Sequence, residues 1–203
     1  MSAQVAKPVL NVSAAFPLSA TRRALLLDRD GVINVNFGYV HTPESTQWVD
    51  GIFDLCRAAE AAGYALVVVT NQAGIARGFY SEEQFAQYTD WMLQQFSMRG
   101  INILRVYYCP HHPSAGEGVY RVDCECRKPR PGMILAAAQD MDIDLAESAM
   151  IGDKASDMQA GRAAGVGMCI QIEDPLEQPS SRMTDVLYAG SLRQAQEYVL
   201  GVG

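Results

Sequence analysis

The sequence predicts an α/β fold with a single parallel β-sheet and helices on both faces. Short apolar runs alternate along most of the chain with longer stretches that have helical spacing, which is the pattern of repeated β-α units. No internal repeat, low-complexity tract or long linker interrupts this alternation. The chain has 203 residues, 49% of them hydrophobic, which is enough for one domain with a real core.

Composition limits the partners and the compartment that we expect. A formal net charge of −7 argues against a nucleic-acid-binding surface, because a phosphate backbone is normally met by a basic face. No apolar run reaches the length of a membrane span, so we expect no membrane association. The five cysteines are an odd number at uneven spacings, which is typical of thiols in a reducing compartment. We therefore expect a cytoplasmic protein that binds a small molecule.

The chain begins with a mildly apolar segment that precedes the first strand. Asn11, Ser13 and Pro17 interrupt this segment and Lys7 supplies its only positive charge, so it does not read as a signal peptide. We expect residues 1–20 to be a tail or an arm packed on the domain, and residues 21–203 to form that domain.

The expected strands and helices alternate from residue 24 to residue 172. Apolar runs of strand length predict the strands Ala24–Leu27, Ala65–Thr70, Ile103–Cys109, Ser148–Gly152 and Val166–Ile172. Helical spacing and good helix formers predict the helices Ile52–Ala62, Glu82–Met98, Gly132–Met141 and Ser156–Ala164. This order predicts a parallel sheet.

The first strand ends abruptly in Asp28-Arg29-Asp30-Gly31. Asp28 and Asp30 are one residue apart, so they lie on the same side of the pleat at the carboxyl end of the strand, where ligands bind in open α/β sheets. Two carboxylates this close repel each other unless a cation lies between them, and Mg²⁺ is a usual partner. Alternatively, both are turn residues and Gly31 supplies a positive φ.

The second strand delivers Thr70-Asn71-Gln72-Ala73-Gly74 to the same edge of the sheet. A hydroxyl followed by loop amides and a glycine suits an oxyanion, because backbone N–H groups at a helix entrance point toward an anion. An N-cap with an ordinary polar loop is the more common explanation of such a sequence.

The third strand leads into a segment that breaks the alternation. Residues 110–131 are rich in Cys, His, Pro and Gly and are too long for an ordinary connection, so they need a reason of their own to be ordered. Cys109 and His111 followed by Cys124 and Cys126 have the spacing of a closed, structural Cys₃His zinc site in a loop spanning residues 109–126. His112 is the rival ligand to His111, and a loop with free thiols is the alternative.

Two further motifs follow the zinc loop. Lys128 would offset the charge of Asp28 and of a phosphoryl group if it reached the strand ends, and Arg127 could grip another part of a substrate. Alternatively, an arginine next to a lysine in the sequence is commonly a pair of solvated surface residues. The fourth strand ends in a third carboxylate, Asp153, which could complete an oxygen-ligand shell or cap the next helix. Asp157 could orient that shell or be a capping residue.

Taken together, DRDGV, VVVTNQAG, RKP and GDKASD in this order resemble the haloacid-dehalogenase-like phosphatases, over about residues 24–172. The resemblance implies a Rossmann-like sheet. The short first gap and the zinc loop in the second gap leave no room for a large cap domain, so the site should be open and substrate choice should fall to loops. A polynucleotide 3′-phosphatase has a similar fold, but the acidic balance weighs against it.

The segments NFGYV, TNQAGIARGFY, CPHHP with CEC, and CRKPRPGM are similar to one branch of this family, which removes the C7 phosphate of D-glycero-D-manno-heptose 1,7-bisphosphate. Heptose 1-phosphate is the product and feeds lipopolysaccharide or related glycoconjugate synthesis. Histidinol phosphatases are similar in the same motifs and are the alternative. A zinc-stabilised module that binds metal or phosphate without catalysis is the second alternative. We expect a monomer that acts on a sugar bisphosphate.

The resemblance also implies a role for each site residue. Asp28 is the nucleophile that forms an aspartyl-phosphate, and Asp30 is the general acid and then the base. Thr70 and Lys128 stabilise the phosphoryl group. Mg²⁺ is held by the Asp28 carboxylate, the Asp30 backbone carbonyl and Asp153. The residues implied to contact the substrate are Asn36, Phe37, Gly38, Tyr39, Asn71, Gln72, Ala73, Arg127 and Lys154.

Overall fold

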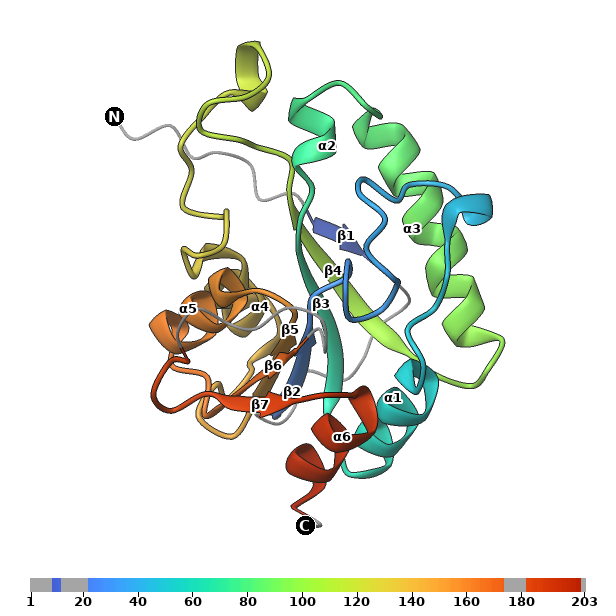
Figure 1. The fold of residues 1–203 in the computed structure, drawn as a ribbon, viewed down its shortest axis with the longest axis vertical. Helices are drawn as coiled ribbons and strands as arrows, with labels where there is room; N and C mark the ends of the chain where they lie inside the picture. The colour runs from blue at the N-terminus through green and yellow to red at the C-terminus, as the bar shows by residue number, and fades with distance from the viewer. Residues whose placement is uncertain (1–8, 12–21, 174–181, 202–203) are drawn as a thin grey trace.

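The computed structural model describes residues 9–11, 22–173 and 182–201. Seven strands in these residues form one sheet, in the order β1-β4-β3-β2-β5-β6-β7 (Figure 1). The strands are β1 (Val9–Asn11), β2 (Ala24–Leu27), β3 (Ala65–Asn71), β4 (Ile103–Cys109), β5 (Ala149–Gly152), β6 (Met168–Ile172) and β7 (Leu187–Ala189). Neighbouring strands from β4 to β7 pair in parallel, whereas β1 pairs antiparallel with β4 at the edge.

Helices cover both faces of the sheet. The α-helices are α1 (Ile52–Ala61), α2 (Ala73–Ala76), α3 (Glu82–Ser97), α4 (Gly132–Met141), α5 (Ala155–Ala164) and α6 (Leu192–Leu200). Two 3₁₀ turns, η1 (Pro43–Ser45) and η2 (Gly118–Tyr120), lie in the loops. Figure 1 shows α4 and α5 on one side of the sheet and α1, α3 and α6 on the other.

The central strand β2 divides the core in two, as expected for a strand buried on both faces. Leu25 and Leu27 pack in the cluster beneath α1, α3 and α6, whereas Ala24 and Leu26 pack in the cluster beneath α4 and α5. All four side chains are fully buried. Burial on both faces makes β2 the most constrained strand, so the residues that follow it are firmly placed.

The structure confirms the predicted fold class of a single sheet with helices on both faces, and its described residues contain no large cap domain. Each expected strand and helix is present, with ends that move by one or two residues. The sequence analysis missed β1, β7, α2 and α6, which are short or lie beyond the clear alternation. The expectation for residues 1–20 falls outside the described residues except for Val9–Asn11, which join the sheet.

The parallel register brings several strand ends to one edge. Leu27 of β2 pairs with Val68 of β3 and with Ile151 of β5, so the residues that follow β2 and β5 emerge side by side. Gly31 makes this approach possible. Its φ is +94°, and a Cβ at this position would lie 2.3 Å from Oδ2 of Asp153. None of the described helices is both long and apolar enough to span a membrane.

Candidate active site

Three carboxylates gather at the strand-end edge of the sheet. Asp28 follows β2, Asp153 follows β5, and Asp157 lies in the first turn of α5. One oxygen from each lies within 4.8 Å of the others. Burial raises the pKa of Asp28, and burial together with the charge of Asp28 raises the pKa of Asp153 to about 7. The cluster therefore carries more negative charge than its surroundings compensate.

Lys128 is the cation at the centre of this cluster, and only 3% of it is exposed. Its Nζ lies 2.9 Å from Oδ1 of Asp28 and 2.6 Å from Oδ1 of Asp157, and it donates a 2.7 Å hydrogen bond to the carbonyl of Val69. Burial alone would lower the pKa of Lys128, but the two carboxylates outweigh burial and raise it. Lys128 is thus a fixed positive charge beside Asp28 and not a surface residue.

Asp157 does more than cap a helix. One oxygen accepts from the backbone N–H of Lys154 at the start of α5, and the other pairs with Lys128. The first contact is the capping role that the sequence offered for Asp157, and the ion pair with Lys128 is a contact that the sequence did not indicate. Gly152 permits this packing, because a Cβ there would lie 2.3 Å from the Cβ of Asp157.

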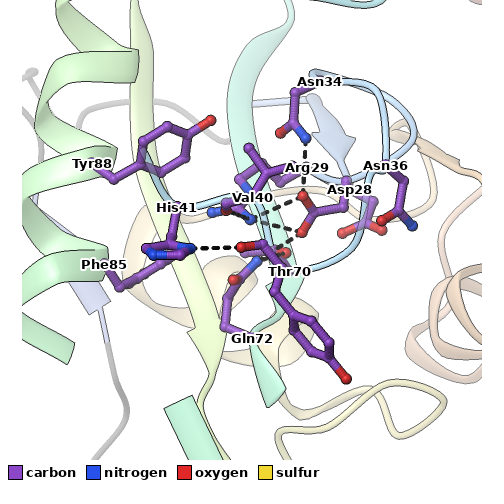
Figure 2. Close-up of polar contacts among 12 residues, drawn as sticks. Asp28, Arg29, Asn34, Asn36, Val40, His41, Thr70, Gln72, Phe85 and Tyr88 are labelled. Carbon is purple, nitrogen blue, oxygen red and sulfur yellow. Dashed lines mark hydrogen bonds and ion pairs between the residues drawn. The ribbon is translucent and has the colours of Figure 1, made fainter. Parts of the chain in front are cut away.

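Asp30 lies beside the cluster, but its carboxylate has a different set of partners. Arg29, Asn34 and Gln72 converge on this region in Figure 2, and all three donate to the Asp30 carboxylate. Burial would raise the pKa of Asp30, but the charge of Arg29 and these hydrogen bonds lower it. Asp28 and Asp30 therefore differ in environment although they are one residue apart.

The end of β3 and the loop that follows it contact Lys128 and Asp30. Asn71 donates from Nδ2 to the carbonyl of Lys128 and accepts from its backbone N–H, so the amide fixes the backbone of the RKP motif. Gln72 donates from Nε2 to both Thr70 Oγ1 and Asp30. Ala73 begins the short helix α2. The polar loop is therefore part of the site, as the sequence predicted.

An open pocket of about 580 Å³ lies over these groups. Every residue predicted for the active site or for substrate contact lines it, with the exception of Phe37, Thr70 and Asp153. Thr70 is buried beneath Gln72, and Asp153 belongs to the carboxylate cluster. Phe37 is 64% exposed and lies outside the pocket lining, unlike the other residues of its loop.

The structure adds site residues that the sequence analysis did not name. Tyr80 lines the pocket and donates from its hydroxyl to Oε1 of Gln72, which fixes the amide that contacts Asp30. Arg29 is completely buried beside Asp30. The identity of these residues was visible in the sequence, but their importance depends on contacts between loops that no local pattern reveals.

The carboxylate cluster fits a divalent cation. In the described part of the chain, Oδ1 of Asp153 is buried and has no hydrogen-bond partner. Asp28 lies close enough to raise the pKa of Asp153 by its charge. A hard cation with oxygen ligands would satisfy the unpaired oxygen and relieve this repulsion. The donor set is therefore appropriate for Mg²⁺.

The predicted zinc ligands also come together. The Sγ atoms of Cys109, Cys124 and Cys126 lie 3.0–3.5 Å apart, and Nδ1 of His111 lies 3.4 Å from Cys126 and 3.8 Å from Cys109. Tetrahedral zinc with Zn–S bonds of about 2.3 Å requires sulfur separations of roughly 3.8 Å, close to this spacing. His112 instead accepts hydrogen bonds from its own loop. The geometry selects His111 and suits a closed structural site.

Comparison with known proteins gives a consistent result. A family model described as HAD-hydrolase-like matches residues 125–170. The D-glycero-beta-D-manno-heptose-1,7-bisphosphate 7-phosphatase of Vibrio cholerae is 46% identical over 181 residues, which cover 88% of this chain and 97% of that protein. The D-glycero-alpha-D-manno-heptose-1,7-bisphosphate 7-phosphatase of Burkholderia mallei is 55% identical over 152 residues, covering 75% of this chain and 80% of that protein.

Solved structures extend the similarity to the fold. A putative HAD-like phosphatase from Mesorhizobium loti superposes with a TM-score of 0.81 at 31% identity, covering 95% of this chain and 91% of that one. The D,D-heptose 1,7-bisphosphate phosphatase from B. bronchiseptica, solved with magnesium and phosphate, superposes with a TM-score of 0.76 at 28% identity. That match covers 89% of this chain and 99% of the other.

Proposed function

Because the chain belongs to the D-glycero-D-manno-heptose-1,7-bisphosphate 7-phosphatase family of haloacid-dehalogenase-like phosphatases, we propose that it removes the C7 phosphate from heptose 1,7-bisphosphate. The family consists of phosphoric monoester hydrolases. The observation that carries the proposal is that Asp28 and Lys128 form an ion pair in the lining of an open pocket, with Asp153 beside Asp28 in the carboxylate cluster. It combines a nucleophile, a cation and a metal-binding carboxylate.

Asp28 attacks the phosphorus of the C7 phosphate and forms an aspartyl-phosphate, while the bond from phosphorus to the C7 oxygen breaks. Asp30 gives its proton to that oxygen. Water then attacks the phosphorus and loses its proton to Asp30, so that inorganic phosphate leaves and Asp28 is regenerated. Lys128, held by Asp157, balances the charge of Asp28 and of the phosphoryl group. Thr70 and Asn71, the last two residues of β3, would support the same group.

The carboxylates of Asp28 and Asp153 and the backbone carbonyl of Asp30 would hold Mg²⁺. When bound, the ion would screen the anionic nucleophile from the anionic phosphate. The unpaired oxygen of Asp153 supports this assignment. In the same way, the Cys₃His cluster would hold a structural zinc ion that fixes the loop preceding Arg127.

Two cationic side chains in the pocket lining are available to the part of the substrate beyond the C7 phosphate. Arg127 and Lys154 both line it, and they would contact the sugar or its second phosphate. Asn36, Gly38 and Tyr39 also line the pocket and would contact the sugar. Phe37 of the same loop is exposed and lies outside the pocket lining, so we do not assign it a substrate contact.

We further propose that residues 21–203 form the catalytic domain and that the protein acts as a cytoplasmic monomer without a nucleic-acid or membrane partner. None of the five cysteines forms a disulfide, which supports a reducing compartment. The net charge of −7 weighs against binding to nucleic acid.

Phosphate release tests the function directly. The substrates are both anomers of heptose 1,7-bisphosphate, histidinol phosphate and fructose 1,6-bisphosphate, each with and without Mg²⁺. We expect the highest kcat/KM on a heptose bisphosphate and its loss when Mg²⁺ is removed. A higher kcat/KM on histidinol phosphate would replace the proposed substrate with the alternative one.

The nucleophile is tested by Asp28→Asn. This variant keeps the size of the side chain but removes the attacking carboxylate, so we expect loss of all turnover on every substrate. Asp123→Asn is the matched control, because Asp123 is an exposed partner of Arg130 and should keep full activity. Turnover by Asp28→Asn at the wild-type rate would contradict the mechanism.

A further inference from the structure

Arg29 is a completely buried cation between the two strand-end aspartates. A buried charge is costly, and an apolar side chain of similar size is often as stable or more stable at such a position. Among the described residues, Asp30 is the only carboxylate that forms an ion pair with Arg29. The contacts between Arg29 and Asp30 therefore indicate the function of the buried guanidinium.

Arg29 contacts both oxygens of the Asp30 carboxylate through a single nitrogen. Its Nη2 lies 2.9 Å from Oδ1 and 2.8 Å from Oδ2, and it also donates to the carbonyl of Val40 at 2.6 Å. Asn34 donates to Oδ1 at 3.0 Å and Gln72 donates to Oδ2 at 3.1 Å. The carboxylate is thus held at both oxygens by three side chains.

All three of these neighbours present N–H groups to Asp30. Arg29 has no acceptor atom, and the amide of Gln72 is oriented by Tyr80, whose hydroxyl donates to Oε1. A proton carried by Asp30 therefore finds no acceptor among the side chains that hold the carboxylate. The remaining direction is the pocket, which Asp30 lines and where the leaving oxygen of a substrate would lie.

Two aromatic rings of helix α3 also contact the guanidinium of Arg29. The central carbon of Arg29 lies 5.1 Å from the ring centroid of Tyr88 and 5.7 Å from that of Phe85, within the range of cation–π attraction. In Figure 2, Tyr88 extends from α3 toward Arg29. Tyr88 is in turn fixed by a hydrogen-bond contact between its hydroxyl and Oγ1 of Thr46.

We propose that Arg29 is a positioning residue for proton transfer: it holds the Asp30 carboxylate so that its proton is directed at the leaving oxygen. This inference rests on the proposed function, in which Asp30 is the general acid. Arg29 does not touch the substrate, since it is absent from the pocket lining. It acts through Asp30.

Two substrates with different leaving groups separate this role from a structural one. The alkoxide of a sugar needs a proton to leave, whereas the phenolate of p-nitrophenyl phosphate leaves without one. The variants are Arg29→Met, which keeps the volume without the charge, and Arg29→Lys, which keeps the charge without the planar group. We expect kcat/KM on heptose bisphosphate to fall about 10²-fold in Arg29→Met, with a much smaller fall on p-nitrophenyl phosphate. Arg29→Lys should show a smaller loss with the same selectivity.

Arg23→Met is the matched control, because Arg23 precedes the same strand and also packs on an aromatic ring, that of Tyr64, but far from the pocket. It should keep the wild-type ratio between the two substrates. Asp30→Asn should show the same selective loss as Arg29→Met. A crystal structure of Arg29→Lys should show a reoriented Asp30 carboxylate.

The possible failures are distinguishable. If the wild type does not hydrolyse heptose bisphosphate, or if Asp30→Asn loses both substrates equally, the proposed function or its acid is wrong. If Asp30→Asn is selective but the Arg29 variants lose both substrates equally, or lose neither, the positioning role is overturned. Failure of both Arg29 variants to fold would equally overturn it in favour of a structural role.

Discussion

Lys128 shows how much one residue depends on its neighbours. The sequence predicted that it offsets the charge of Asp28, and the structure confirms a 2.9 Å ion pair between them. The second partner, Asp157, lies closer at 2.6 Å and connects Lys128 to the start of α5. With two carboxylates around one ammonium, neither Asp28 nor Asp157 alone controls the position of Nζ.

We expect Asp157→Asn to lower both stability and turnover. The substitution leaves Lys128 buried with one charged partner in place of two, and disrupting a buried ion pair costs about 3 kcal/mol. A displaced Nζ should reduce kcat on the order of 10- to 100-fold. Thermal unfolding and phosphate release measure the two effects.

The control for this substitution is again Asp123→Asn. Asp123 pairs with Arg130 on the surface, where ion pairs contribute little. Its melting temperature and kcat should match those of the wild type. An Asp157→Asn variant with unchanged kcat would show that Asp157 only caps α5.

The zinc loop is the element that connects the metal ligands to the active site. Arg127 donates from Nη1 to the carbonyl of His111, so a hydrogen bond joins the RKP motif to the Cys₃His cluster. Tyr120 in the loop donates to Glu82 at the start of α3. Gly116 approaches α2 so closely that a Cβ there would lie 2.1 Å from the carbonyl oxygen of Ala76. The loop thus contacts α3 and α2, and α2 contributes Ala73 and Gly74 to the pocket lining.

We expect Cys124→Ala to lower zinc content, stability and activity together. The loop has little apolar core of its own, so without the metal its backbone would lose its fixed position before Lys128. Metal analysis, thermal unfolding and phosphate release on the same preparation measure the three effects.

Cys169→Ala is the matched control, because Cys169 is a buried thiol between α5 and β6, outside the zinc cluster. It should lose some stability from the cavity but keep its zinc. Absence of zinc from freshly purified wild-type protein would contradict the assignment.

Two clusters of buried hydrophobic side chains, one on each face of the sheet, form the core of the molecule. The residues proposed for catalysis lie at the carboxyl ends of the central strands β2, β3 and β5. Strand β1 is an edge strand that pairs only with β4 among the described strands. The residues proposed for catalysis therefore depend on central strands and not on β1. Burial of β2 on both faces gives them a rigid support.

We expect deletion of residues 1–20 to leave kcat and KM unchanged. The deletion removes β1 and exposes the edge of β4, so self-association should increase, because an unpaired edge strand is a template for pairing. Phosphate release and sedimentation velocity measure the two outcomes. The full chain should sediment at the mass of one chain, and loss of activity in the deletion would place a functional residue within residues 1–20.

The sequence by itself determined the strands β2 to β6, the main helices, the strand-end aspartates and the Cys₃His spacing, because these depend on local periodicity and on residues close together in the chain. Only the tertiary structure decided which histidine joins the cysteines, what Asp157 does and what holds Asp30. Those answers depend on contacts between residues far apart in sequence: Asp157 with Lys128, and Gln72 with Asp30. Local patterns do not encode such contacts, since packing of the whole sheet is needed to bring the loops together.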